Sequence, residues 1–83
     1  MKTLSLAQFA NHSKEIDHSP SFTIHSIEGN EVMRERLQEM GLLAGTGIQY
    51  LGRAPFGGPL LIRYDVCDLA LREEEAKCLI LSL

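Results

Sequence analysis

The sequence predicts a mainly β protein, a small closed or nearly closed barrel of about five short strands with one α-helix inserted after the first. Three observations predict it. Apolar and polar residues alternate over several short stretches, and glycine- and proline-marked turns separate these stretches. One longer segment has helical spacing and ends at Gly41. Short strands in so small a chain favour a barrel, because closure leaves fewer strand edges exposed.

The chain has 83 residues, so a single domain is expected. Residues 1–21 would form a short N-terminal helical segment and a polar loop, and residues 22–83 the barrel core. Within the first part, residues 3–10 predict a helical turn capped by Thr3. Residues 11–21 are polar and contain a proline, which is typical of a loop.

The first barrel strand is predicted at residues 22–27, which are rich in aromatic and β-branched side chains. Phe22 and Ile24 would face the core. Asn30 follows as a helix cap, because its side-chain oxygen can accept a hydrogen bond from an N–H group of the first helical turn.

The inserted helix is predicted at residues 31–40. Its apolar residues recur at i, i+4 and i+7 and form one stripe, made of Met33, Leu37 and Met40. Gly41 stands where a left-handed residue would end the helix, and Leu42 would fold back on Leu37. Gly45 is expected to be a structural turn. It is not part of a phosphate loop, because the sequence after it lacks the lysine and continues into a strand.

The rest of the barrel is predicted from alternation and turn residues. Four more strands are expected at residues 47–53, 60–64, 67–71 and 78–83. Residues 54–59 hold two prolines and two glycines, so they form the tip of a hairpin. Residues 65–66 predict a tight turn and residues 72–76 a single helical turn.

Composition excludes several classes of partner. The net charge of -3 argues against a nucleic-acid binder and against direct binding to an anionic membrane. The apolar run at residues 78–81 is too short to span a bilayer, and no secretory signal is visible at the start. A cytoplasmic protein is therefore expected, with Cys67 and Cys78 as reduced, buried thiols.

No catalytic motif is present, so we do not expect an enzyme. Four groups of side chains could be considered as metal ligands: His12, Asp17 and His18; Cys67 and Cys78; Met33 and Met40; and Glu73, Glu74 and Glu75. Each group has a plainer interpretation, as a solvated loop, core thiols, core thioethers or a solvated helical turn. We assign no metal site and no cofactor, and expect at most weak, adventitious binding of Fe²⁺ or Zn²⁺. Arg53, Arg63 and Arg72 could form a basic face for an acidic partner or be ordinary surface charge.

The chain resembles the ferrous iron transport protein A (FeoA) family from about residue 22 to residue 83. The segments that carry this resemblance are Ile27-Glu28-Gly29, Arg36-Leu37-Gln38-Glu39-Met40-Gly41-Leu42, Gly45-Thr46, Arg53-Ala54-Pro55-Phe56-Gly57-Gly58-Pro59 and Leu69-Ala70-Leu71-Arg72-Glu73-Glu74-Glu75-Ala76. The resemblance implies an SH3-like barrel and an accessory role beside the membrane iron permease FeoB, which carries a GTP-binding domain. Three positions depart from the family pattern: Ala44, Gly58 and Val66.

The resemblance and the turn residues together indicate docking on that permease, which would bring the protein to the inner face of the membrane. The candidate partner-binding residues are Ala54, Pro55, Phe56, Gly57, Gly58 and Pro59. A tip rich in proline and glycine can present Phe56 with little ordering cost, although Phe56 could also fold back on its own barrel. The alternative function is a metal-binding or metal-sensing module, similar to the C-terminal domain of iron-dependent repressors. The oligomeric state does not follow from the sequence.

Overall fold

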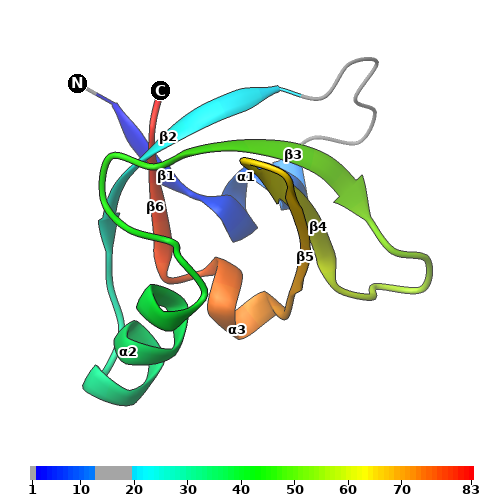
Figure 1. Ribbon diagram of the computed structural model, residues 1–83. Coiled ribbons are helices and arrows are strands. Elements are labelled where there is room, and N and C mark those ends of the chain that lie inside the picture. The colour runs from blue at the N-terminus through cyan, green and yellow to red at the C-terminus, as the bar shows by residue number, and fades with distance from the viewer. Residues whose placement is uncertain (1, 13–19) are drawn as a thin grey trace.

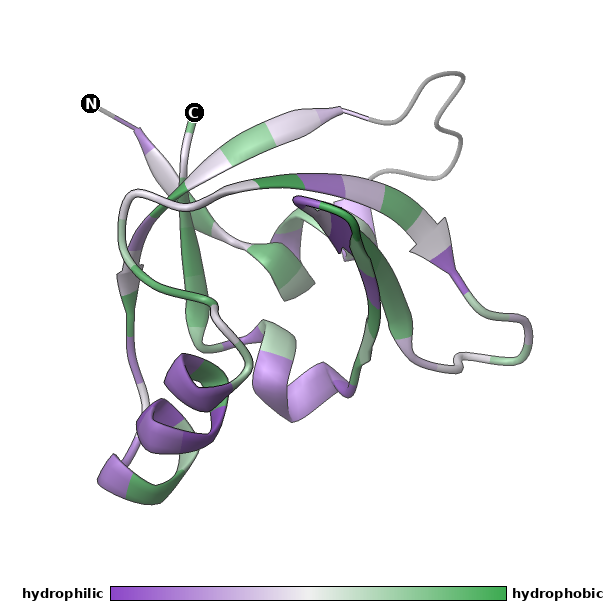
Figure 2. Cartoon of the chain, in the orientation of Figure 1, coloured by the Kyte–Doolittle hydropathy of each residue, from purple (hydrophilic) through white to green (hydrophobic). Residues whose placement is uncertain are grey.

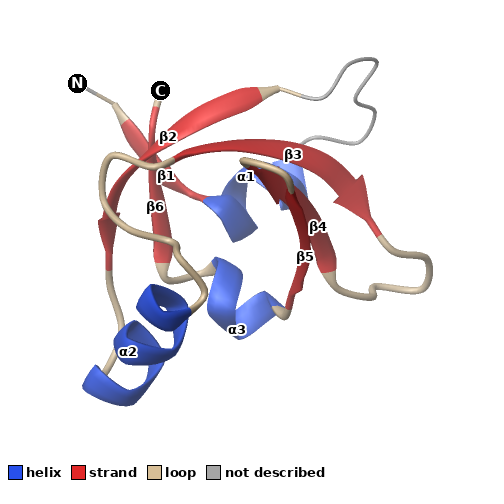
Figure 3. Ribbon diagram, in the orientation of Figure 1, coloured by secondary structure: helices blue, strands red, loops and turns tan. Residues whose placement is uncertain are grey.

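The computed structural model describes residues 2–12 and 20–83 (Figure 1). In chain order its elements are β1 (Thr3–Ser5), α1 (Leu6–His12), β2 (Ser21–Ile27), α2 (Glu31–Glu39), β3 (Gly47–Arg53), β4 (Leu60–Tyr64), β5 (Cys67–Leu71), α3 (Glu73–Ala76) and β6 (Leu79–Ser82). The strands curl round a common interior, and the three helices lie inside or beside the curled sheet (Figure 3). The mainly β class and the helix inserted after the first predicted strand are confirmed.

The sheet has six antiparallel strands in the order β1-β6-β2-β3-β4-β5. The strand that the sequence did not predict is β1. It pairs with the last strand, β6, through Thr3↔Ser82 and Ser5↔Ile80. The prediction of a helical turn beginning at Thr3 is therefore wrong for its first three residues. Pairing with a strand at the far end of the chain decides their conformation, and no local propensity reports such a partner.

The helix α1 begins at Leu6 and is capped by Ser5, not by Thr3. The backbone N–H of Gln8 donates to Ser5 Oγ at 3.1 Å, and the backbone N–H of Ser5 donates to Gln8 Oε1 at 3.1 Å. These reciprocal bonds satisfy two N–H groups at the start of α1. The helix also continues to His12, so residues 11 and 12 do not belong to a loop.

The core lies between the curled sheet and the helices. Its buried apolar members are Leu6, Ala7, Ala10, Ile24, Leu37, Leu42, Ile48, Tyr50, Leu60, Ile62, Leu71, Ala76, Leu79 and Leu81. Ile24 is buried and Phe22 is partly buried against this core, as predicted. Figure 2 shows the contrast between β6, which is mostly apolar, and α2, which is mostly hydrophilic. Leu37 is the one fully buried residue of α2, and Met33 and Met40 pack beside it half-buried.

Both ends of α2 are capped by the residues that the sequence predicts. Asn30 Oδ1 accepts the backbone N–H of Met33 at 2.8 Å. At the other end Gly41 has φ +91°, and the N–H of Leu42 reaches the carbonyl oxygen of Leu37 at 3.1 Å. The N–H of Gly41 also donates to the carbonyl oxygen of Gln38 at 2.9 Å. These two bonds form the pattern that ends many helices at a left-handed residue. A Cβ at Gly41 would lie 2.9 Å from Tyr64 Oη, so the position also lacks room for a side chain.

The strands β3, β4 and β5 have the predicted bounds and form two successive hairpins. The β3–β4 pairing contains a register shift between Tyr50 and Gly52. The β4–β5 connection is a two-residue turn, Asp65 and Val66, in which Asp65 has φ +53°. Asp is among the residues that tolerate a positive φ, and a positive φ at the first position suits a tight hairpin.

Candidate functional site

The tip of the β3–β4 hairpin, residues 54–59, projects beyond the sheet (Figure 1). The N–H of Ala54 donates to the carbonyl oxygen of Pro59 at 2.9 Å and closes the base of the tip. The N–H of Gly58 lies 3.2 Å from the carbonyl oxygens of both Ala54 and Pro55. A Cβ on Gly58 would come within 2.9 Å of the Ala54 Cβ atom, so this close approach requires glycine. The tip is thus internally hydrogen-bonded and tightly turned.

Phe56 combines two unfavourable features at the end of this tip. Its φ is +62°, and the side chain is fully exposed, at 106% of the reference accessibility. A left-handed backbone costs a non-glycine residue about 1–2 kcal/mol. Of the two orientations left open by the sequence, the structure has the one in which Phe56 points to solvent. Because strained backbone conformations cluster at functional sites, Phe56 is a candidate contact residue.

A polar cluster fixes the base of the tip to two helices. Arg53 Nη2 lies 2.9 Å from Glu73 Oε2 and 3.1 Å from Asn11 Oδ1. The amide nitrogen of Asn11 in turn donates to Glu73 Oε1 at 3.3 Å. The hydrogen bond from Arg53, and then that from Asn11, lowers the pKa of the Glu73 carboxyl below its ordinary value. The cluster joins α1, β3 and α3, and so it restricts the directions in which the tip can move.

A hollow of about 470 Å³ lies between the tip and the end of β5. Its lining consists of Gly57, Gly58, Pro59, Ala70, Arg72, Glu73 and Glu74. The two glycines, the proline and the alanine leave its floor without large side chains. Arg72 and Glu74 are exposed at its rim, whereas Glu73 is held by Arg53.

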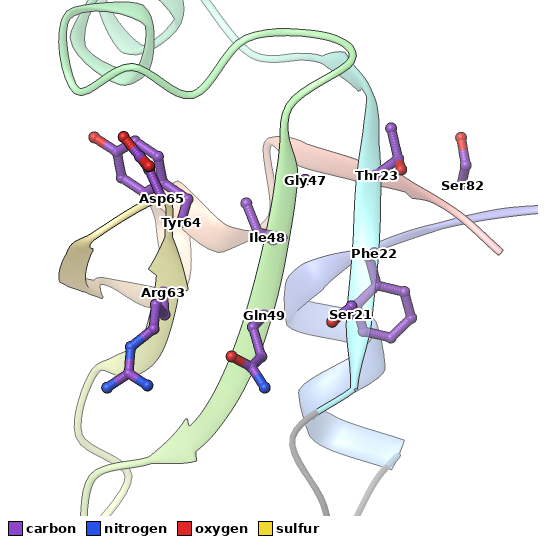
Figure 4. A pocket seen from close by; sticks show the side chains of 10 residues that line it. All are labelled: Ser21, Phe22, Thr23, Gly47, Ile48, Gln49, Arg63, Tyr64, Asp65 and Ser82. Atoms are coloured by element: carbon purple, nitrogen blue, oxygen red, sulfur yellow. The ribbon is translucent and has the colours of Figure 1, made fainter.

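A second hollow, of about 480 Å³, lies on the outside of the sheet where β2, β3 and the end of β4 meet (Figure 4). It is open and polar, with Ser21, Thr23 and Ser82 supplying hydroxyl groups. Its cation, Arg63, forms a double hydrogen bond to Asp68, with Nε–Oδ1 at 2.6 Å and Nη2–Oδ2 at 3.0 Å. The hollow therefore presents no unpaired cation among its lining residues.

The arginines do not form a basic face. Arg53 and Arg63 each form an ion pair with a carboxylate. Of these three described arginines, Arg72 is the one for which no ion pair is found. The acidic run after β5 is not a uniform solvated turn either. Glu75 is only 7% exposed, and its Oε1 accepts the backbone N–H of Arg72 at 2.8 Å. Most of these charged side chains therefore form ion pairs or cap the start of α3.

The candidate ligands of the His, Cys, Asp and Glu types do not gather into a metal site within residues 2–12 and 20–83. In that part of the chain no three His, Cys, Asp or Glu side chains lie close enough to hold a metal ion. Asp17 and His18 lie outside the described residues. Cys67 is exposed and not buried as predicted, because it starts β5 directly after the exposed turn, and Cys78 is half-buried. Burial raises the pKa of the Cys78 thiol, and the nearby carboxylates of Glu28 and Glu75 act in the same direction.

Sequence reasoning missed the cluster of Asn11, Arg53 and Glu73. Asn11 is 42 residues from Arg53 and 62 residues from Glu73 in the chain, and no local pattern connects them. It also missed the capping pair at the start of α1. There a signal was available, because a serine followed three residues later by a glutamine is typical of a helix start.

A profile of the FeoA domain matches residues 14–83. The chain belongs to the FeoA family. A FeoA-like protein from Clostridium acetobutylicum is 26% identical, with a TM-score of 0.79 over 100% of this chain and 88% of its own. FeoA from Stenotrophomonas maltophilia, solved in complex with zinc and described as an SH3-domain protein, is 26% identical, with a TM-score of 0.69 over 95% of this chain and 89% of its own. The SH3-like fold expected from the sequence is confirmed.

The FeoA fold also occurs in metal-dependent repressors. ScaR with bound Cd²⁺ is 18% identical, with a TM-score of 0.76 over 95% of this chain and 34% of its own, a likeness that shows the fold alone. Among curated proteins none matches this sequence. None of the helices in the described part of this FeoA-family chain is long and apolar enough to cross a membrane.

Proposed function

We propose that this FeoA-family protein is an accessory protein of ferrous iron uptake and not an enzyme. It acts in the cytoplasm by docking on the GTP-binding iron permease FeoB and regulating its transport activity. The observation that carries the proposal is Phe56, fully exposed with φ +62° on a tip whose base is tied to two helices. The family match supports the link to ferrous iron transport.

The tip is ordered before it meets a partner. An interface gains affinity when the contact residues are already ordered, because binding then loses less conformational entropy. The hydrogen bonds within residues 54–59 and the Arg53–Glu73 contact supply that order. Aromatic residues that fill a partner's pocket are the common anchors of protein interfaces. Phe56 has the position and the exposure of such an anchor.

The test compares Phe56→Ala with a matched control at another exposed apolar position, away from the tip. Val66→Ala removes another exposed apolar side chain, at 89% accessibility, from the opposite end of β4. Isothermal titration calorimetry with detergent-purified FeoB should show binding of the wild type and of Val66→Ala, and a weakened affinity for Phe56→Ala. Equal affinities for all three proteins would remove the tip from the docking surface. An absence of binding by the wild type would refute the docking role itself.

The alternative function, a metal-binding or metal-sensing module, has less support. The Stenotrophomonas relative was solved with zinc, but the described residues of this chain bring no ligand group together. The regulatory role therefore rests on contact with a protein partner, and any Fe²⁺ or Zn²⁺ binding would be weak and adventitious.

A further inference from the structure

The sheet ends in two edge strands that differ in how they are protected. The edge strand β1 has three residues and follows Lys2, and shortness and a lysine are both common means of preventing unwanted pairing. The edge strand β5 has five residues in regular register with β4, without a bulge, a proline or a lysine. Among the described residues β5 pairs with β4 alone. Its second edge is a template for one more strand.

The register shows which backbone groups point to that edge. Tyr64 and Cys67 flank a two-residue turn, so they form a hydrogen-bonded pair, and the pairs alternate from there. Asp68 and Ala70 therefore direct their N–H and C=O groups away from β4. The contact between the Arg63 and Asp68 side chains agrees, because side chains approach more closely in the non-hydrogen-bonded pairs.

The same edge adjoins the hollow beside the tip. Ala70 is exposed on the outer face and lines this hollow together with Gly58 and Pro59. A strand added to β5 would place the residue opposite Ala70 with its side chain on this outer face. The volume of about 470 Å³ and the four small uncharged lining residues suit a large apolar side chain there, with the charged residues Arg72, Glu73 and Glu74 beside it. One partner could thus contact Phe56 and the β5 edge together.

We infer that an extended segment of the protein that docks on the tip adds to the sheet beside β5. Its main chain pairs with the outward N–H and C=O groups of Asp68 and Ala70, and one large apolar side chain enters the hollow. Main-chain bonds supply affinity in this mode of recognition, and the alternate side chains supply specificity. The inference rests on the proposed docking role, but it concerns a different contact from Phe56.

The test uses Ala70→Pro and Ala70→Val in the full chain. Proline removes the outward N–H without breaking a bond to β4, so the protein should fold, as circular dichroism would check. Valine keeps the N–H and suits a strand. We expect Ala70→Pro to weaken FeoB binding by about tenfold or more, the scale of a lost main-chain hydrogen bond, while Ala70→Val changes it less. Equal binding by Ala70→Pro and wild type would overturn the inference and leave a Phe56-dependent docking role intact.

Amide hydrogen exchange gives a readout that does not depend on variants. In the free protein the N–H groups of Asp68 and Ala70 should exchange fast compared with that of Leu69. After exchange in the presence of detergent-purified FeoB, quenching and NMR of the released chain should show both groups protected. Protection that appears without FeoB and rises with protein concentration would assign the edge to a second copy of this chain and overturn the inference. Fast exchange of both groups in the complex would also overturn it.

Discussion

Replacing Phe56 should separate the stability of the fold from the binding of its partner. The side chain is fully exposed, so its removal takes nothing from the core, whereas truncating a buried phenylalanine costs about 3–5 kcal/mol. Asparagine tolerates the left-handed backbone that Phe56 adopts at φ +62°. We therefore expect Phe56→Asn to unfold at the same denaturant concentration as the wild type or higher, with a gain of up to about 1 kcal/mol.

The same replacement should be severe for binding. Truncating an aromatic anchor at an interface costs about 2 kcal/mol or more, which corresponds to roughly a thirtyfold rise in Kd. Urea unfolding and titration calorimetry with FeoB measure the two quantities on the same protein. A loss of stability above about 2 kcal/mol would mean that Phe56 packs against the barrel, contrary to its exposure. An unchanged Kd in a stable variant would refute the role of the tip.

Three further predictions concern the polar cluster of Asn11, Arg53 and Glu73, the end of α2 and metal ions. The pKa of Glu73 is lowered in the folded protein, so its stabilising contribution is complete above the ordinary value of 4.5 and is lost as the pH falls through the lowered value. Glu73→Gln should therefore flatten the acid side of the stability curve, and an unchanged acid side would contradict the pairing with Arg53. Gly41→Ala should cost more than Gly45→Ala in urea unfolding, because both glycines have φ +91° and only Gly41 lacks room for a Cβ. Equal losses would show that the contact at Gly41 is unimportant. Titration of untagged protein with Fe²⁺ and Zn²⁺ should show no binding tighter than roughly millimolar, the range of the weakest protein-built calcium sites, and micromolar binding would restore the metal-sensing alternative.

The centre of the fold followed from local signals. The alternation in β3, β4 and β5 fixed their bounds, and the apolar stripe with Asn30 and Gly41 fixed α2. The strand β1 could not be predicted in this way, because three residues carry no usable alternation and their partner is β6, at the other end of the chain. Cys67 was misjudged for a related reason. Its exposure depends on its place beside a turn, and its residue type alone predicts burial.

The sequence indicates which residues form the candidate site, but it does not predict their conformation or their contacts. Proline and glycine indicate a turn at residues 54–59, but residue type does not predict a positive φ at a phenylalanine. The polar cluster of Asn11, Arg53 and Glu73 forms only when α1, β3 and α3 meet in space. Contacts of this kind follow from topology, and a pattern within one segment cannot show them.

Docking of the chain on the iron permease through its tip can be tested in the native membrane. The most direct measurement is an affinity pull-down from detergent-solubilised native membranes with tagged wild-type protein and tagged Phe56→Asn, followed by quantification of FeoB in both eluates. We expect FeoB to co-purify with the wild type and to be strongly depleted with the variant. Absence of FeoB from the wild-type eluate, or equal recovery with both proteins, would contradict docking through the tip.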